Sequence, residues 1–267
     1  IISPLFGCLV AFIIFTIIKK SILSSSQPIA QTKKIGPFFT GLVAFMLSLA
    51  INYKGLKNLH LDLPLFQALL VSLLVGFFGF LVGFIFLRRY KEKDMDPYYQ
   101  VERMANPLQV LSASYQAFSH GANDVANAVG PVAAIVAIIH THQVKMEVPV
   151  PIWLLLIGGV GLGMGIYFWG HRVMETVGEK ITSITPTRGF SAEFGTATTV
   201  LICSRLGMPV STTHVAVGNI IGVGLARGIS AINISVIKKI FSAWIISLPA
   251  AGLFSIIIYF ILKLLFV

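Results

Sequence analysis

Apolar segments long enough to cross a lipid bilayer recur along the whole sequence. The clearest runs from Leu63 to Leu87 and contains only Gln67 and Ser72 as polar residues. A spanning helix needs about 20 apolar residues, because it rises about 1.5 Å per residue across a core of about 30 Å. Of the 267 residues, 56% are hydrophobic and 11% are charged, well below the charge of soluble domains. We predict an all-α polytopic membrane protein, which excludes nucleic-acid binding, a disulfide scaffold and disorder.

Seven segments are predicted to span the membrane. They are Ile1–Ile18, Ile35–Ile51, Leu63–Leu87, Pro107–Ile139, Pro151–Trp169, Thr213–Ala226 and Ile240–Phe266. The 20 Lys and Arg residues, against 10 Asp and Glu, lie mostly between these segments. Basic residues crowd the loop from Arg88 to Arg103, whereas the preceding loop has only Lys54 and Lys57. The positive-inside rule therefore puts Arg88 to Arg103 in the cytoplasm. The glycines at 79, 83, 159, 161, 163 and 165 have the spacing that lets helices pack closely.

The two ends of the chain resemble each other. IISPLFG from Ile1 and IISLPAAG from Ile245 share Ile-Ile-Ser and then Pro-x-x-Gly, with an offset of one residue. Transporters built from two related halves have such repeats, although two apolar helices can also match by chance. The chain opens inside an apolar stretch without Met, so we expect a fragment of a longer protein. Inverted repeats make matching spans antiparallel, which requires a re-entrant hairpin, and Ser191–Leu206 is its candidate.

Polar residues interrupt one apolar segment at SHGANDVANAVGP, from Ser119 to Pro131. Ionisable groups at membrane depth cost at least about 2.5 kcal/mol on insertion scales and are candidates for function. The Gly, Asn, Asp and Pro residues favour a helix broken near Gly121, with Asp124 or Asn123 capping its second half. Asp124 and Asn127 would then share one face. Oxygen ligands suit a small cation and a helix N-terminus suits an anion, while the alternative is that Asp124 only caps a packed helix.

A second polar region extends from Thr185 to Asn219. Glu193 lies there with Thr196 and Thr199 at helical spacing, and the chain is expected to turn at SRLGMP. The next residues, Ser211, Thr212 and Thr213, precede an apolar helix. Their hydroxyls and the free N–H groups of the helix would form an anion cradle. An ordinary Ser/Thr cap after Pro209 is equally compatible with this pattern.

Three further side chains are candidates for parts of the site. Arg205 could add positive charge near the anion cradle, but snorkelling to the membrane surface is the favoured interpretation. His120 and His214 are candidate metal ligands, although no local cluster of other ligands accompanies them. A metal site is therefore the weaker interpretation.

HGANDVANAVGP, followed by GFSAEFGTATT and PVSTTH, resembles the inorganic phosphate transporter (PiT) family in composition, order and spacing. The resemblance runs through the whole chain. It implies two related halves, each with a G-A-N-D-type signature, and phosphate uptake coupled to cations. Residues 1–18 look like the last span of the first half, 19–106 like two linking transmembrane helices with a cytoplasmic loop, and 107–267 like the second repeat. The short loop is typical of microbial members, which implies a multi-pass protein of a microbial inner or plasma membrane.

The resemblance also implies roles for the matching residues. Substrate binding carries over to Asp124, Asn127, Ser211, Thr212 and Thr213, and cation binding, with Na⁺ as candidate, to Asn123, Asp124 and Glu193. Buried carboxylates beside a phosphate are prohibitive without cations. Oxygen ligands fit Na⁺, whereas protonation of buried carboxylates would serve H⁺.

The sequence therefore predicts a cation-coupled symporter of inorganic phosphate that works by alternating access, surrounded by membrane lipid. We expect no cofactor beyond the coupling ion, Na⁺ or H⁺, and the oligomeric state stays open, with a homo-oligomer among the options. A permease for sulfate or another oxyanion remains an alternative. A channel is disfavoured because no selectivity-filter motif or ring of charges is visible. An enzyme is disfavoured because HExxH and GxSxG motifs are missing from the sequence.

Overall fold

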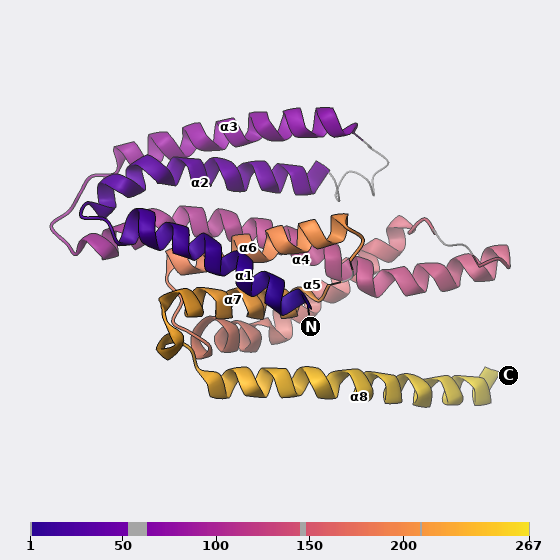
Figure 1. Ribbon diagram of the computed structural model, residues 1–267. Helices are drawn as coiled ribbons and strands as arrows, with labels where there is room; N and C mark the ends of the chain where they lie inside the picture. The colour runs from indigo at the N-terminus through magenta and orange to yellow at the C-terminus, as the bar shows by residue number, and fades with distance from the viewer. Residues whose placement is uncertain (1, 53–62, 145–147, 209, 267) are drawn as a thin grey trace.

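The computed structural model describes residues 2–52, 63–144, 148–208 and 210–266. Within these ranges the chain is helical, without β-strands, and the long helices lie side by side as Figure 1 shows. The main helices are α1 (Ile2–Ile18), α2 (Pro28–Ala50), α3 (Leu65–Arg89), α4 (Pro97–Thr141), α5 (Ile152–Glu175), α6 (Pro186–Arg205), α7 (Thr212–Arg227) and α8 (Ile234–Phe266). Short π-helices follow α1 (Lys19–Leu23) and α5 (Thr176–Lys180), and a 3₁₀ turn (Ile229–Ala231) precedes α8. The all-α prediction is confirmed.

Six helical segments in the described part of the chain are long and apolar enough to cross a membrane. They are Ile2–Leu23, Pro28–Ala50, Leu65–Arg89, Pro97–Thr141, Ile152–Lys180 and Ile234–Leu265. The expected seventh span, Thr213–Ala226, instead forms α7, which has 16 residues and is not among the six. Ile1, Lys54, Lys57 and Pro209, which entered the sequence predictions, lie outside the described residues.

α6 and α7 form a helical hairpin. α6 begins and α7 ends at the same end of the molecule, on the left of Figure 1, and the chain turns back between Arg205 and Thr212. The hairpin thus contains the expected re-entrant segment Ser191–Leu206, but its second arm is the segment that was predicted to span. Because α7 returns to the end of the molecule where α6 begins, α1 and α8 run in opposite directions, as Figure 1 shows. That arrangement meets the antiparallel requirement of an inverted repeat.

α1 packs against the hairpin through glycine. A Cβ at Gly218 of α7 would collide with the carbonyl oxygen of Pro4, and one at Gly222 with that of Cys8. On the α1 side, a Cβ at Gly7 would lie 2.7 Å from the carbonyl oxygen of Val215. The two backbones therefore approach each other as closely as small-residue motifs permit in membranes.

The predicted glycine contacts divide into two groups. Cβ atoms at Gly79 and Gly83 of α3 would lie 2.6 Å from Cβ of Ala44 and 2.8 Å from Oγ1 of Thr40, so these glycines pack α3 against α2 as expected. The glycines of α5 at 159, 161, 163 and 165 differ, because a Cβ there would have no described atom within 4 Å. For these α5 glycines the packing prediction is wrong in this chain, since the helix is open at all four positions.

α4 is one continuous helix, which overturns the predicted break near Gly121. Its 45 residues correspond to about 68 Å, roughly twice the hydrocarbon thickness. Two prolines, Pro107 and Pro131, lie inside it. Proline has no N–H, so the carbonyls of Arg103 and Asn127 lose their usual helical donors. The proline positions loosen the helix at two points and release a carbonyl oxygen near Asp124, without ending the helix there.

Candidate functional site

A polar stripe runs along α4 on the side of the hairpin. Its residues recur at intervals of three or four, which places them on one helix face. They are Gln109, Ser112, Gln116, His120, Asn123, Asp124 and Asn127. All of them lie between Pro107 and Pro131. The sequence prediction recognised its second half and missed Gln109, Ser112 and Gln116, although their spacing within an apolar segment was a usable signal.

Asp124 joins the stripe to the start of α7. One carboxylate oxygen accepts a hydrogen bond of 2.8 Å from the hydroxyl of Thr212, and the other lies 2.8 Å from Nε2 of His120, one helical turn earlier. Thr212 is buried, while Asp124 and His120 are partly exposed. The structure therefore brings together two predicted site residues that are 88 positions apart in the sequence.

Asn123 contacts the turn of the hairpin. Its amide nitrogen lies 3.4 Å from the carbonyl oxygen of Val210, and its amide oxygen accepts a hydrogen bond from Ser204 at 3.4 Å. Both bonds are long, so they hold the turn loosely. Asn123 and Asp124 together connect α4 to both sides of the turn between α6 and α7.

The three hydroxyl residues of the turn have different surroundings. Ser211 is the N-cap of α7, where its Oγ accepts a hydrogen bond of 3.4 Å from the backbone N–H of His214. Ser211 and Thr213 are exposed, whereas Thr212 is buried against Asp124. The ordinary capping role that the sequence left open is thus present at Ser211. It coexists with an accessible helix N-terminus that carries two exposed hydroxyls.

Glu193 lies further along the stripe. Ser112 donates to one of its oxygens at 2.6 Å, and the amide of Gln109 donates to the other at 3.5 Å. Glu193 lines two partly open cavities between α4, α5 and the hairpin. One of about 360 Å³ also includes His120, Gln116 and Gly121. The other, of about 300 Å³, shares Gln116 and includes Gln109 and Thr196. Together they form a groove, here called the polar groove, along the stripe.

Other predicted residues do not enter the groove. Asn127 is exposed on α4 beyond the hairpin turn. The ring of His214 stacks on Trp244 of α8, with centroids 3.8 Å apart. Arg205 is exposed at the end of α6. Among the described residues, no three His, Cys, Asp or Glu side chains gather closely enough to hold a metal ion, so the weaker metal interpretation of His120 and His214 gains no support.

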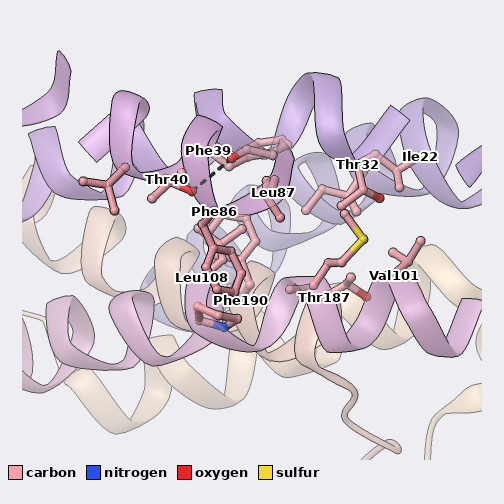
Figure 2. Close-up of a pocket in the computed structure, with 17 residues that line it drawn as sticks. Ile22, Thr32, Phe39, Thr40, Phe86, Leu87, Val101, Leu108, Thr187 and Phe190 are labelled. Atoms are coloured by element: carbon pink, nitrogen blue, oxygen red, sulfur yellow. Dashed lines mark hydrogen bonds between the residues drawn. The ribbon is translucent and has the colours of Figure 1, made fainter. Parts of the chain in front are cut away.

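A further cavity, separate from the two that form the polar groove, is mainly apolar. It encloses about 230 Å³ between α2, α3, α4 and α6, and Figure 2 shows Phe39, Phe86 and Phe190 among the side chains that line it. Threonine hydroxyls are the polar groups among its described lining residues, and one of them, from Thr40, is already bonded to the carbonyl of Gly36 at 3.1 Å. An apolar cavity of this kind does not suit an anion. The candidate functional site is therefore the polar groove together with the contact of Asp124 with Thr212, which lines neither cavity but adjoins the groove through His120.

The chain is similar to known proteins over nearly its whole length. A protein of Pyrococcus abyssi described as a phosphate permease is 46% identical over 98% of this chain, and one of Haemophilus influenzae with the same description is 38% identical over 99%. A solved structure described as the sodium-dependent phosphate transporter superposes with a TM-score of 0.86 at 41% identity over 98% of the chain. This chain spans 64% of the length of each of these proteins.

These relatives are described as phosphate permeases and as a phosphate transporter. Six apolar spans and this likeness make the chain part of a multi-pass membrane protein. The model of the phosphate transporter family matches residues 1–255. The chain belongs to the phosphate transporter family.

Proposed function

We propose that this chain supplies the second half-site of a Na⁺-coupled symporter of inorganic phosphate. The observation that carries the proposal is the contact of Asp124 with Thr212, which links the signature of α4 to the N-terminus of α7. A helix N-terminus attracts anions through its free N–H groups and its dipole. Phosphate oxygens would bind there, with the exposed hydroxyls of Ser211 and Thr213 as donors.

The negative charge of the same site requires a cation. Asp124, Glu193 and a phosphate of about one to two negative charges give about three to four negative charges along the polar stripe and the hairpin. Na⁺ would be held by hard oxygen ligands. Around Asp124 these are its own carboxylate, the amide oxygen of Asn123 and the Asn127 carbonyl that Pro131 leaves without a helical donor. Glu193 bonds to Ser112, about 18 Å along α4 from Asp124, so its carboxylate would hold a separate cation. The similar solved structure is described as sodium-dependent, which favours Na⁺ over H⁺.

The membrane potential also calls for coupling. Moving one negative charge into an inside-negative cell costs about 2.3 kcal/mol per 100 mV. Enough Na⁺ must accompany each phosphate to reverse the sign of the transported charge. Alternating access would then carry phosphate and Na⁺ across the membrane together, with a total charge that is zero or positive. In this proposal residues 1–18 are the last span of a first repeat, residues 19–106 link the repeats, and residues 107–267 form the second repeat.

Transport by the full-length protein in proteoliposomes tests this function. Asp124→Asn keeps the size of the side chain and removes its charge, so Na⁺-driven phosphate uptake should fall by at least about 100-fold, equivalent to about 2.7 kcal/mol. Asp94→Asn, in the loop before α4, is the matched control and should transport normally. Uptake that persists in Asp124→Asn with unchanged Na⁺ dependence would contradict the proposal. Uptake driven by a proton gradient alone would assign H⁺, and preference for sulfate would assign the alternative substrate.

A further inference from the structure

Two arginines converge at the end of the molecule where α6 begins and α7 ends. Nη1 of Arg188 lies 3.1 Å from the carbonyl oxygen and 3.2 Å from the hydroxyl of Ser183. Nη1 of Arg227 lies 3.3 Å and 3.0 Å from the same two oxygens, and 2.8 Å from the hydroxyl of Thr182. Two guanidinium groups that share acceptors lie side by side, and like charges at this distance repel.

The nearby acidic side chain, Glu102, accepts hydrogen bonds from threonines rather than from the two arginines. Glu102 of α4 accepts hydrogen bonds from the hydroxyls of Thr185 and Thr187 at 2.7 and 2.9 Å, and from the backbone N–H of Thr187 at 2.8 Å. It therefore caps the N-terminus of α6. The ion pairs in the described part of the chain join Lys33 to Glu92, His120 to Asp124 and Lys180 to Glu175. The two arginines bond instead to neutral oxygens.

The local charge is positive. Burial and the charge of Arg227 lower the pKa of Arg188, against an opposing effect of Glu102. Lys19 reaches the same region, since its Nζ donates to the carbonyl of Ala226 at 2.9 Å. Nε of Arg188 is buried and has no hydrogen-bond partner among the described residues. This Nε is not accessible to an ion from solvent, but both arginines are partly exposed, and guanidinium groups beside an excess of positive charge have the properties of an anion site.

The polar groove extends toward the chain segments that carry this pair, but neither arginine lines it. Its second cavity, lined by Glu193 and Gln116, also includes Ile184 and Gly189. These residues adjoin Ser183 and Arg188 in the sequence. The arginines lie at the same end of the molecule as the start of α4 (Figure 1) and the basic loop Arg88–Arg103, which the positive-inside rule assigns to the cytoplasm.

We propose that Arg188 and Arg227 bind a phosphate-type oxyanion at the cytoplasmic end of the polar groove. The guanidinium groups would hold its oxygens in bidentate fashion, and Ser183 would orient both groups. The oxyanion has two chemical sources: inorganic phosphate that leaves or enters the groove, and the phosphate of an anionic lipid headgroup. The first source rests on the proposed transport function, whereas the second is independent of it.

The first experiment measures binding of radiolabelled inorganic phosphate to the full-length protein, purified in detergent and delipidated. The background variant is Asp124→Asn, which removes the charge of the half-site. Added to it, Arg188→Gln with Arg227→Gln should weaken the remaining phosphate binding by at least tenfold. Arg172→Gln, which changes an exposed arginine of α5, is the matched control and should bind as the background does.

The second experiment measures retention of phosphatidylglycerol or phosphatidic acid by native mass spectrometry. A lipid adduct that is lost in the double arginine variant, with phosphate binding unchanged, assigns the lipid source. Phosphate binding and lipid retention that both stay at the level of Arg172→Gln overturn the proposal. If Asp124→Asn still transports, the proposed function fails, yet loss of binding in the arginine variant would still identify this site.

Folding is controlled by Arg188→Lys with Arg227→Lys. Lysine keeps both charges and removes the bidentate geometry, so this variant should elute as the wild type does in size-exclusion chromatography and bind phosphate with intermediate affinity. Wild-type affinity in the lysine variant would contradict bidentate binding. If the double glutamine variant does not elute as folded protein, Arg188→Gln alone gives the same test, because Arg227 keeps its bond to Thr182.

Discussion

α1 and α8 carry related sequences in very different surroundings. In α1 the motif residues Pro4 and Gly7 are buried against α7, together with Ala11. At the matching position of α8, Gly252, a Cβ would have no described atom within 4 Å. The described apolar window of α8 is not buried at all. A small-residue motif therefore gives a helix the capacity to pack closely, and the presence of a hairpin decides whether that capacity is used.

The comparison also bears on the first repeat. α1 would end one repeat and packs on the hairpin of the other. By the same symmetry, the open face around Gly252 would receive a hairpin of the first repeat. The relatives are longer than this chain, and this chain spans 64% of their length. Matched substitutions on the packed surface of α1 and on the open surface of α8 therefore test whether packing distinguishes the two helices.

The largest expected effect is at the matched glycines. Gly7→Leu should destabilise this chain by about 3 kcal/mol, because its side chain would collide with Asn219 and the backbone of Val215. Gly252→Leu should leave the chain unchanged. Fluorescence-detected size-exclusion chromatography after heating measures both. If both variants behave alike, the packing of α1 is not what distinguishes the two helices. In a longer form of the protein, destabilisation by Gly252→Leu would indicate that another segment packs on this face of α8.

A smaller effect is expected at two glutamates. Glu193 accepts hydrogen bonds from Ser112 and Gln109 within the packed region. Glu193→Ala would leave these buried donors with weaker partners and should cost about 1–2 kcal/mol. Glu175 pairs with Lys180 on the exposed α5 side, and Glu175→Ala should not change the apparent melting temperature. Equal shifts in the two variants would contradict the contrast between packed and open surfaces.

The smallest effect is expected at adjacent threonines. Thr212→Val removes the hydrogen bond to Asp124 and should cost about 1 kcal/mol. Thr213 is exposed at the same helix start, so Thr213→Val should change stability by less than about 0.5 kcal/mol. The same melting assay compares them. If the proposed function holds, Thr213→Val should raise the KM for phosphate while the fold stays intact, and an unchanged KM would remove Thr213 from the substrate site.

Much of this arrangement could be predicted from local sequence patterns. The six spans follow from apolar length, and the polar residues of the hairpin turn were recognised from Ser-Thr-Thr before an apolar helix. The pairing of the signature with that turn was also expected, and Asp124 does contact Thr212. The roles of these residues in binding phosphate or Na⁺ stay predictions.

The errors have separate physical causes. Gly121 was expected to break α4, but glycine costs a helix only about 1 kcal/mol, and a Cβ at Gly121 would meet no described atom within 4 Å. Packing of the rest of the helix outweighs that cost. The sequence predicts a re-entrant segment for α6 and a membrane span for α7, because hydropathy does not indicate where a chain reverses direction. Gln109 and Ser112 were overlooked because their partner, Glu193, is more than 80 positions away.

The continuity of α4 has a mechanical consequence. One rod touches the start of α6 through Glu102 and the start of α7 through Asp124. Tilting the rod to open one of these ends would displace the other, unless it bends at Pro107, which lies between the two contacts. The angle to which α4 bends at Pro107 would then determine access from the two sides of the membrane. A stiffer helix at Pro107 would lower the turnover rate and reduce leakage through the site.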